Sequence, residues 1–258
     1  MKVKEVLEAL DHLFPFDLAF EGDNVGLQCG ELNNEVKGIV LALDPLPEAL
    51  DFALKEEANL LITHHPLIFT PLRKVTSFPV LVKAIKSDLN IISLHTNLDI
   101  AFGGVNDQLA FKLKLEGIRV LEEKGEGAIA RWGELNPPRA LKELAEEVAR
   151  RLETKVRFLG KAEEMISKVV ICGGKGESLI PLVKSKGAEV FITGDVGYHS
   201  SLKALEIGLN LIDATHQATE RVVLPVLKEK LQRELSLIGW QGKIKIFAGE
   251  PLSWVEVE

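Results

Sequence analysis

Apolar positions along the chain follow two alternating spacings. Short runs of branched apolar residues predict buried strands at 38–43, 60–62, 91–94, 169–171, 190–192, 209–212 and 244–247. Between most of these runs, apolar residues recur every three or four positions, which predicts helices near 2–13, 46–54, 80–85, 106–115, 178–183 and 201–207. This alternation of strands and helices is typical of an α/β protein with largely parallel sheets and helices on both faces.

The middle of the chain departs from this alternation. Residues 128–134 and 156–159 fit strands, and a helix over 141–152 opens after Pro137 and Pro138. We therefore expect an N-terminal α/β lobe over 1–120, a connecting segment or small module over 121–165, and a C-terminal α/β lobe over 166–258. A single compact domain overall is the alternative.

Two further features bear on this architecture. Pro225 lies inside a long helical pattern from about 216 to 235, where it should kink the helix or begin a new one. Residues 57–63 resemble 187–193, and residues 90–93 resemble 210–213. Two α/β halves across one crevice would bring their strand ends together, although matches this short also arise by chance.

Five of the six histidines lie in four short stretches that follow predicted strands: 62–65, 94–99, 194–199 and 213–220. Three of these stretches also contain an acidic residue. Imidazole and carboxylate are the ligands that borderline and hard divalent metals prefer. Strand ends are also where an open α/β sheet builds its binding site. The sequence therefore predicts a metal site at these strand ends.

Each candidate ligand has a structural alternative. Adjacent residues of a strand point to opposite faces, so His64 and His65 can share a centre only if the backbone turns there; otherwise one is buried and one exposed. His216 and Glu220 would share one helix face, as metal ligands or as an ordinary solvated pair. Asp99 fits a ligand or a turn residue.

Other candidates are equally open. His199 fits a proton carrier or a surface histidine at a helix start, and His95 fits a proton carrier or a core histidine bonded to a carbonyl. His12 is interpreted as structural. The glycine-rich stretch 172–178 could hold an anion at a helix start, but it lacks the spacing of known phosphate loops, and a tight turn with close packing is favoured.

Composition and charge narrow the class of protein. An apolar fraction of 46% with 27% charged residues is ordinary for a soluble globular protein. No apolar run approaches the roughly 18–20 residues of a membrane span, and the N-terminus lacks a signal-peptide core. Two distant cysteines fit reduced thiols, so we expect a cytoplasmic protein without a membrane partner. The net charge of −7 makes nucleic acid an unfavourable partner.

Five spaced motifs resemble those of the NIF3-like family, whose members are often labelled GTP cyclohydrolase 1 type 2 homologs. The motifs occupy residues 23–27, 63–67, 95–99, 194–199 and 216–220, and the length resembles members without an inserted domain. The resemblance implies two similar α/β lobes with mixed, largely parallel sheets facing a shared cleft. It also implies a homohexamer built from three dimers, with the sites facing an internal cavity.

The resemblance further implies a two-metal site, which falls on His64, His65, Asp99, His216 and Glu220. Nitrogen and oxygen ligands without cysteine suit two divalent ions, whether zinc, iron, manganese or nickel. Either Glu220 or Asp99 would bridge the ions, and open positions would be left for water.

This ligand set predicts a metal-dependent hydrolase acting on a small-molecule substrate. His199 and His95 are candidate catalytic proton carriers. Thr63, Asp44 and Asp195 are candidates to orient ligand histidines or bind substrate. The family label implies a nucleotide substrate, with GTP opened to a dihydroneopterin-type product and formate. The alternatives are a non-catalytic metal-binding protein and a hexameric regulatory interaction protein.

Overall fold

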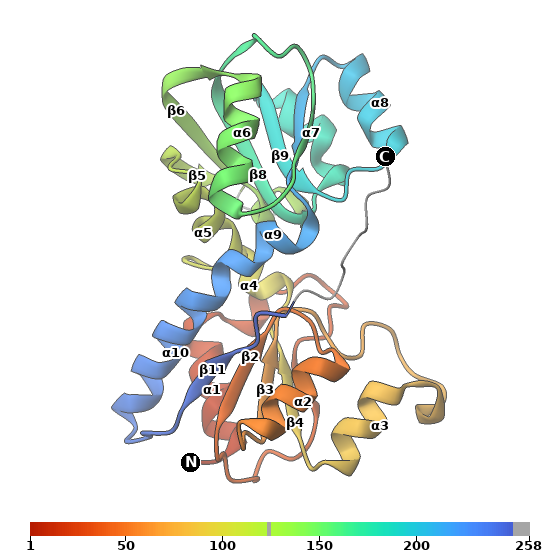
Figure 1. Ribbon diagram of the computed structural model, residues 1–258, viewed down its shortest axis with the longest axis vertical. Helices are drawn as coiled ribbons and strands as arrows, with labels where there is room; N and C mark the ends of the chain where they lie inside the picture. The colour runs from red at the N-terminus through yellow and green to blue at the C-terminus, as the bar shows by residue number, and fades with distance from the viewer. Residues whose placement is uncertain (123–124, 250–258) are drawn as a thin grey trace. The chain divides into compact units, whose positions relative to one another are not determined.

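The computed structural model describes residues 1–122 and 125–249, which form two compact units (Figure 1). The first unit contains Met1–Leu98 and the described residues from Leu224 onward, and the second contains Asp99–Val223. The first unit is therefore built from two separate stretches of chain. This grouping differs from the expected division at residues 120 and 165.

The first unit has a five-stranded sheet in the order β1-β4-β3-β2-β11. Only β1 is antiparallel to its neighbour, and the other pairs are parallel. Its elements are α1 (Val3–Leu13), β1 (Gly26–Cys29), β2 (Ile39–Ala42), α2 (Pro47–Lys55), β3 (Leu60–Thr63), α3 (Pro79–Lys86), β4 (Asn90–Ser93), α10 (Leu224–Leu237) and β11 (Ile244–Ile246), with 3₁₀ turns at Phe16–Leu18 and Val75–Ser77. Helix α4 (Thr96–Ile100) follows β4 at the boundary of the units.

The second unit has a six-stranded sheet in the order β5-β6-β8-β9-β10-β7. Strands β8, β9 and β10 are parallel, and the other pairs are antiparallel. Its elements are α5 (Val105–Lys112), β5 (Glu116–Val120), β6 (Arg131–Ala140), α6 (Leu141–Leu152), β7 (Arg157–Leu159), β8 (Met165–Lys175), α7 (Ile180–Ser185), β9 (Val190–Gly194), α8 (Tyr198–Glu206), β10 (Asn210–Asp213) and α9 (His216–Glu220), with 3₁₀ turns at Gly125–Ile129, Glu177–Leu179 and Arg221–Val223.

Burial explains the continuous apolar runs of the central strands. Every residue of β2, β3 and β4 is buried, as expected for parallel strands covered on both faces. In β8, Val169 and Ile171 join one apolar cluster, whereas Val170 and Cys172 join the cluster on the opposite face. The prediction of an α/β protein with two mixed sheets is confirmed.

The two units share a strand arrangement that supports the repeat in the sequence. Strands β1-β4-β3-β2 of the first sheet and β7-β10-β9-β8 of the second follow the same order and directions. Asn90 lies opposite Leu60 in one sheet, and Asn210 lies opposite Val190 in the other. Both asparagine side chains donate a 2.9 Å hydrogen bond to the carbonyl of the residue that precedes the neighbouring strand.

Two segments clarify the sequence pattern. Strand β6 pairs antiparallel with β8, so the region expected to connect two lobes extends the second sheet instead. The helical pattern around Pro225 is divided, because α9 ends at Glu220, a 3₁₀ turn follows, and α10 starts at Leu224. Proline is tolerated in the first turn of a helix, where its missing N–H has no intrahelical partner. Pro225 therefore marks a restart.

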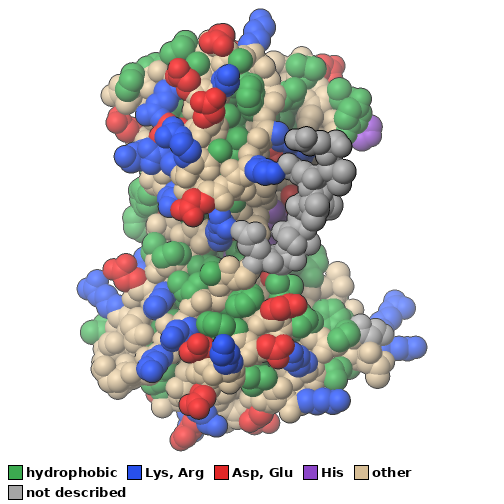
Figure 2. All heavy atoms as spheres, viewed as in Figure 1, with side chains coloured by type: hydrophobic (Ala, Val, Ile, Leu, Met, Phe, Trp, Pro, Cys, Tyr) green, Lys and Arg blue, Asp and Glu red, His purple; other side chains and the backbone are tan. Residues whose placement is uncertain are grey.

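The helices in the part of the chain that the structure describes are all too short or too polar to cross a membrane. On the face drawn in Figure 2, Lys and Arg side chains lie among Asp and Glu side chains.

Candidate metal centre

The first unit brings two neighbouring histidines together where β3 ends. The backbone N–H groups of His64 and His65 donate to Ala42 and Leu43, at 3.2 and 2.9 Å. The Thr63 hydroxyl donates to the carbonyl of His65 at 2.7 Å and closes the turn. The two imidazole ring centroids are consequently 4.9 Å apart. The backbone turns after the strand, as two ligands at one centre would require.

An aspartate fixes the orientation of one of these rings. His65 Nδ1 lies 2.7 Å from Oδ1 of Asp44, which follows β2. A ring that donates from Nδ1 to a carboxylate presents its Nε2 lone pair to a metal, and such pairs are common beside metal sites. The neighbouring His64 is only 1% exposed. Asp44 therefore lies where a residue that orients a ligand histidine must lie.

His95 lies beside this pair and has its own carboxylate partner. Its ring centroid is 5.5 Å from that of His64 and 5.9 Å from that of His65. Its Nδ1 lies 2.8 Å from Asp23 Oδ1, and the Thr96 hydroxyl donates to Asp23 Oδ2 at 2.5 Å. The side-chain partner of His95 Nδ1 is thus a carboxylate, and not the backbone carbonyl expected of a core histidine.

Asp23 begins the first of the five family-like motifs, at 23–27, but the sequence assigned it no role of its own. Burial alone would raise its pKa, but hydrogen bonds from His95 and Thr96 outweigh burial and lower the pKa to about 2. The charged carboxylate is therefore favoured in the folded protein. The Asp23 charge contributes stability fully above the ordinary pKa of 3.8, and this contribution is lost as the pH falls toward 2.

Replacing Asp23 with Asn should therefore destabilise the protein by about 1–2 kcal/mol at neutral pH, allowing for partial solvent screening. The difference from the wild type should stay constant down to about pH 4 and then shrink. Urea unfolding between pH 3 and pH 8 measures it, with the exposed Asp17→Asn as control. A difference that grows as the pH falls would contradict this assignment.

The second unit holds a histidine and a glutamate on one face of α9. His216 Nε2 and Glu220 Oε1 are 3.1 Å apart, which is about the separation of two ligands with 2.1 Å bonds to a common ion. His216 Nδ1 lies 2.9 Å from Asp195 Oδ2. His216 and Asp195 thus repeat the arrangement of His65 and Asp44 in the first unit.

The glycines at the end of β8 bring the backbone close to the side chains of His216 and Glu220. A Cβ at Gly174 would lie 2.2 Å from Glu220 Oε1 and 3.1 Å from His216 Nε2, and Gly174 has a φ of +63°. The glycine-rich stretch is therefore the end of a strand, since β8 continues to Lys175. Its geometry supports the close-packing interpretation and leaves space for a ligand pair.

Asp99 lies in the same part of the second unit. Burial raises the pKa of the Cys172 thiol, and the nearby charges of Asp99 and Glu220 raise it further. Asn106 Oδ1 accepts from the Gly173 N–H at 2.7 Å, and its Nδ2 lies 3.3 Å from the Asp99 carbonyl. Asn106, which the sequence did not single out, thus connects α4 to β8.

The remaining candidate, His199, is exposed in the first turn of α8. Its ring centroid lies 5.4 Å from that of Tyr198. Its role as a proton carrier stays a prediction.

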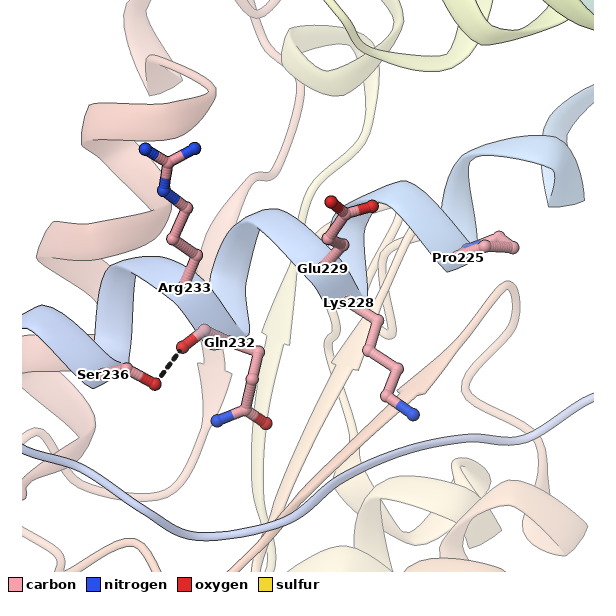
Figure 3. Close-up of a pocket in the computed structure, with 6 residues that line it drawn as sticks. All are labelled: Pro225, Lys228, Glu229, Gln232, Arg233 and Ser236. Carbon is pink, nitrogen blue, oxygen red and sulfur yellow. Dashed lines mark hydrogen bonds between the residues drawn. The ribbon is translucent and has the colours of Figure 1, made fainter.

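Surface shape alone indicates a different region. A shallow hollow of about 370 Å³ lies along α10, where Ser236 donates to the Gln232 carbonyl at 2.7 Å (Figure 3). Its lining residues are Pro225, Lys228, Glu229, Gln232, Arg233 and Ser236. None of these is a candidate ligand, so the chemistry of the histidine clusters is the better guide to function.

Comparison with known proteins connects these clusters to one family. Residues 1–251 match the family model described as Duf34/NIF3 (NGG1p interacting factor 3). A Methanocaldococcus jannaschii protein named "GTP cyclohydrolase 1 type 2 homolog" is 37% identical over 246 residues, covering 92% of this chain and 97% of that protein. A Streptomyces coelicolor protein of the same name is 36% identical, covering 95% and 90%.

Solved structures agree with this match. A Bacillus cereus protein related to NIF3 superposes with a TM-score of 0.94 at 26% identity, covering 100% of this chain and 99% of that one. Reduced HcgD from Methanocaldococcus jannaschii superposes with a TM-score of 0.82 at 33% identity, covering 96% and 98%.

Proposed function

Because the chain belongs to the Duf34/NIF3 family, we propose that it is a metal-dependent hydrolase. Its proposed metal ligands are His64, His65, Asp99, His216 and Glu220. Of these, His64 and His65 follow β3 with their ring centroids 4.9 Å apart, and His216 and Glu220 share one face of α9. We propose that these residues would hold two divalent ions, with the carboxylate of Glu220 or Asp99 shared between them.

The observation that carries the proposal is a histidine–aspartate pair in each unit. His65 and His216 both have Nδ1 within 2.9 Å of an aspartate oxygen, from Asp44 and Asp195 respectively. In each case a neutral ring that donates from Nδ1 is the tautomer that can bind a metal through Nε2. The same histidine–aspartate arrangement in both units is better explained by ligand orientation than by surface pairing.

The side chains fit a divalent ion in both geometry and chemistry. Gly174 lacks the Cβ that would occupy the space beside Glu220 Oε1 and His216 Nε2. Imidazole and carboxylate donors without a thiol suit zinc, iron, manganese or nickel. Bound divalent ions would lower the pKa of a water toward neutrality and polarise an oxygen of the substrate.

The residues of the chain supply the remaining steps of the proposed mechanism. Asp44 and Asp195 hold the tautomers of their histidines, and Thr63 holds the turn that presents His64 and His65. His95, held by Asp23, is proposed to transfer a proton, and His199 is the second candidate for that role.

The proposed substrate is a purine nucleotide. The relatives named above support GTP, which would be opened by water to a dihydroneopterin-type product with release of formate. We also propose a homohexamer, as the resemblance implies, and sedimentation measurements would test this assembly.

His65→Ala or His216→Ala should lower metal affinity by more than tenfold and abolish the opening of the GTP ring with release of formate, because each substitution removes a proposed ligand. Elemental analysis and a GTP assay with and without chelator measure both effects. The matched control is His12→Ala, since the His12 side chain is 75% exposed and pairs with Glu234 at the surface. Turnover that survives complete metal removal would refute the proposed mechanism.

A further inference from the structure

Two loop residues beside the His216–Asp195 pair have unusual backbone conformations. Asp195 has a φ of +54°, and Thr215, which precedes His216, has a φ of +63°. Residues other than glycine rarely adopt such angles, and a β-branched residue such as threonine is especially disfavoured there. Specific interactions must therefore hold these two loops in place.

One carboxylate holds both loops. Asp213, the last residue of β10, accepts a hydrogen bond from the Val196 N–H through Oδ2 and from the Thr215 N–H through Oδ1, both at 3.1 Å. Val196 is the neighbour of Asp195, and Thr215 is the neighbour of His216. The position of Asp213 thus determines how the aspartate and its histidine face one another.

Arg157 of β7 fixes the position of this carboxylate. Its Nε and Nη2 donate to Asp213 Oδ2 at 3.0 and 2.7 Å, and Nη2 also donates to the Val196 carbonyl at 2.7 Å. The backbone of Val196 is therefore held at its N–H by Asp213 and at its carbonyl by Arg157. A planar guanidinium can make these bonds together, whereas a methionine of similar length can make none of them.

The strand pair itself does not need this ion pair. Arg157 lies opposite Asp213 in the antiparallel pair of β7 and β10. In the equivalent pair of the first unit, β1 and β4, Gly26 lies opposite Ser93. The same strand arrangement thus forms with two small residues at this position. The Arg157–Asp213 pair serves a purpose specific to the second unit.

We propose that Asp213 and Arg157 are positioning residues that hold the Asp195–His216 pair in the geometry of a metal ligand. This inference rests on the proposed function, because it takes His216 to bind metal. Neither residue needs to touch metal or substrate. Their effect reaches the ligand through the backbone N–H and carbonyl of Val196 and the Thr215 N–H.

Zn²⁺ affinity of the full chain, measured by competition with a chelating dye, tests the proposal. Asp213→Asn and Arg157→Met should each weaken binding by about 10- to 100-fold, as expected when a partner that orients a ligand histidine is lost. Arg151→Met is the matched control, since it removes an arginine that pairs with Glu147 at 2.6 Å in the same unit. The control should leave Zn²⁺ affinity unchanged.

Thermal unfolding of the metal-free variants separates positioning from general stability. If Arg157→Met and Arg151→Met lower the melting temperature alike but only Arg157→Met weakens Zn²⁺ binding, the proposal holds. Wild-type Zn²⁺ affinity in Arg157→Met would overturn it, whether or not Asp213→Asn folds. His216→Ala is measured in the same assay. If His216→Ala binds Zn²⁺ as tightly as the wild type, the proposed metal site is wrong. If His216→Ala binds Zn²⁺ weakly while Asp213→Asn and Arg157→Met bind it normally, only the positioning inference is wrong.

Discussion

Replacing Gly174 with alanine should lower metal affinity by about 100-fold or more, because it disturbs two proposed ligands together. The new Cβ would lie 2.2 Å from Glu220 Oε1 and 3.1 Å from His216 Nε2. Neither atom is at the end of a freely moving side chain, since Glu220 is only 4% exposed and His216 is bonded to Asp195. The alanine would therefore push the Glu220 carboxylate and the His216 imidazole out of the arrangement in which they lie 3.1 Å apart.

Backbone conformation adds a second cost that must be separated from this collision. Gly174 has a φ of +63°, which costs an alanine about 1 kcal/mol. Gly187→Ala is the matched control, because Gly187 lies in the same unit at a φ of +84°, and an alanine methyl there would have open space within 4 Å. Both variants should carry the backbone cost, but only Gly174→Ala also suffers the collision and should lose metal affinity. Equal Zn²⁺ affinities in the two variants would show that Gly174 does not shape the site.

The sequence predicted that the clustered histidines follow strands, as the structure shows, but it did not indicate every carboxylate that contacts them. His64 and His65 follow a strongly apolar run, so their place after β3 could be predicted from local pattern. Asp23 lies 72 residues from its partner His95, in a loop whose composition indicates only a turn. Such a pairing depends on which strands become neighbours, and no local pattern encodes that.

The glycines of β8 illustrate a second limit. Local composition distinguishes a flexible or tightly packed position from an ordinary one, but it does not name the atoms that approach the missing side chain. The structure shows that Glu220 and His216 approach Gly174 from α9, 42 or more residues later in the chain. Close packing at the glycines of β8 could be predicted from the sequence, but the side chains that pack against Gly174 could not.

The edge strand β11 explains why the C-terminal part of the described chain groups with the first unit. Strand β11 pairs in parallel with β2, so the C-terminal region from α10 onward belongs with the first unit. An apolar run at 244–247 indicates a strand, but its composition fits either sheet equally well. Contiguous lobes are the simplest expectation when pairing partners are unknown.

A buried ion pair supports the region of the second unit that carries Asp99. Arg131 and Asp107 are 3% and 6% exposed at their side chains, and Arg131 Nε donates to Asp107 Oδ1. Arg131 Nη2 also donates to the Ile100 carbonyl at 2.8 Å, one residue after Asp99. Asp107 Oδ2 accepts from the Gly103 N–H at 2.6 Å. The pair therefore joins α5 and β6 to the end of α4.

Asp107→Ala should destabilise the protein by about 3–5 kcal/mol, because it leaves the Arg131 guanidinium buried without its counter-charge. That is a large part of the roughly 5–15 kcal/mol that stabilises an ordinary domain. Urea unfolding followed by circular dichroism measures the change, with Lys83→Met as control. Lys83 pairs with Asp51 at 2.6 Å, but the Asp51 side chain is 64% exposed, so this control should lose about 1 kcal/mol or less. If the two variants lost similar stability, the Arg131–Asp107 pair would stabilise the protein no more than a surface ion pair does. The region around Asp99 would then be supported by the apolar packing of α5 against β6 and β8.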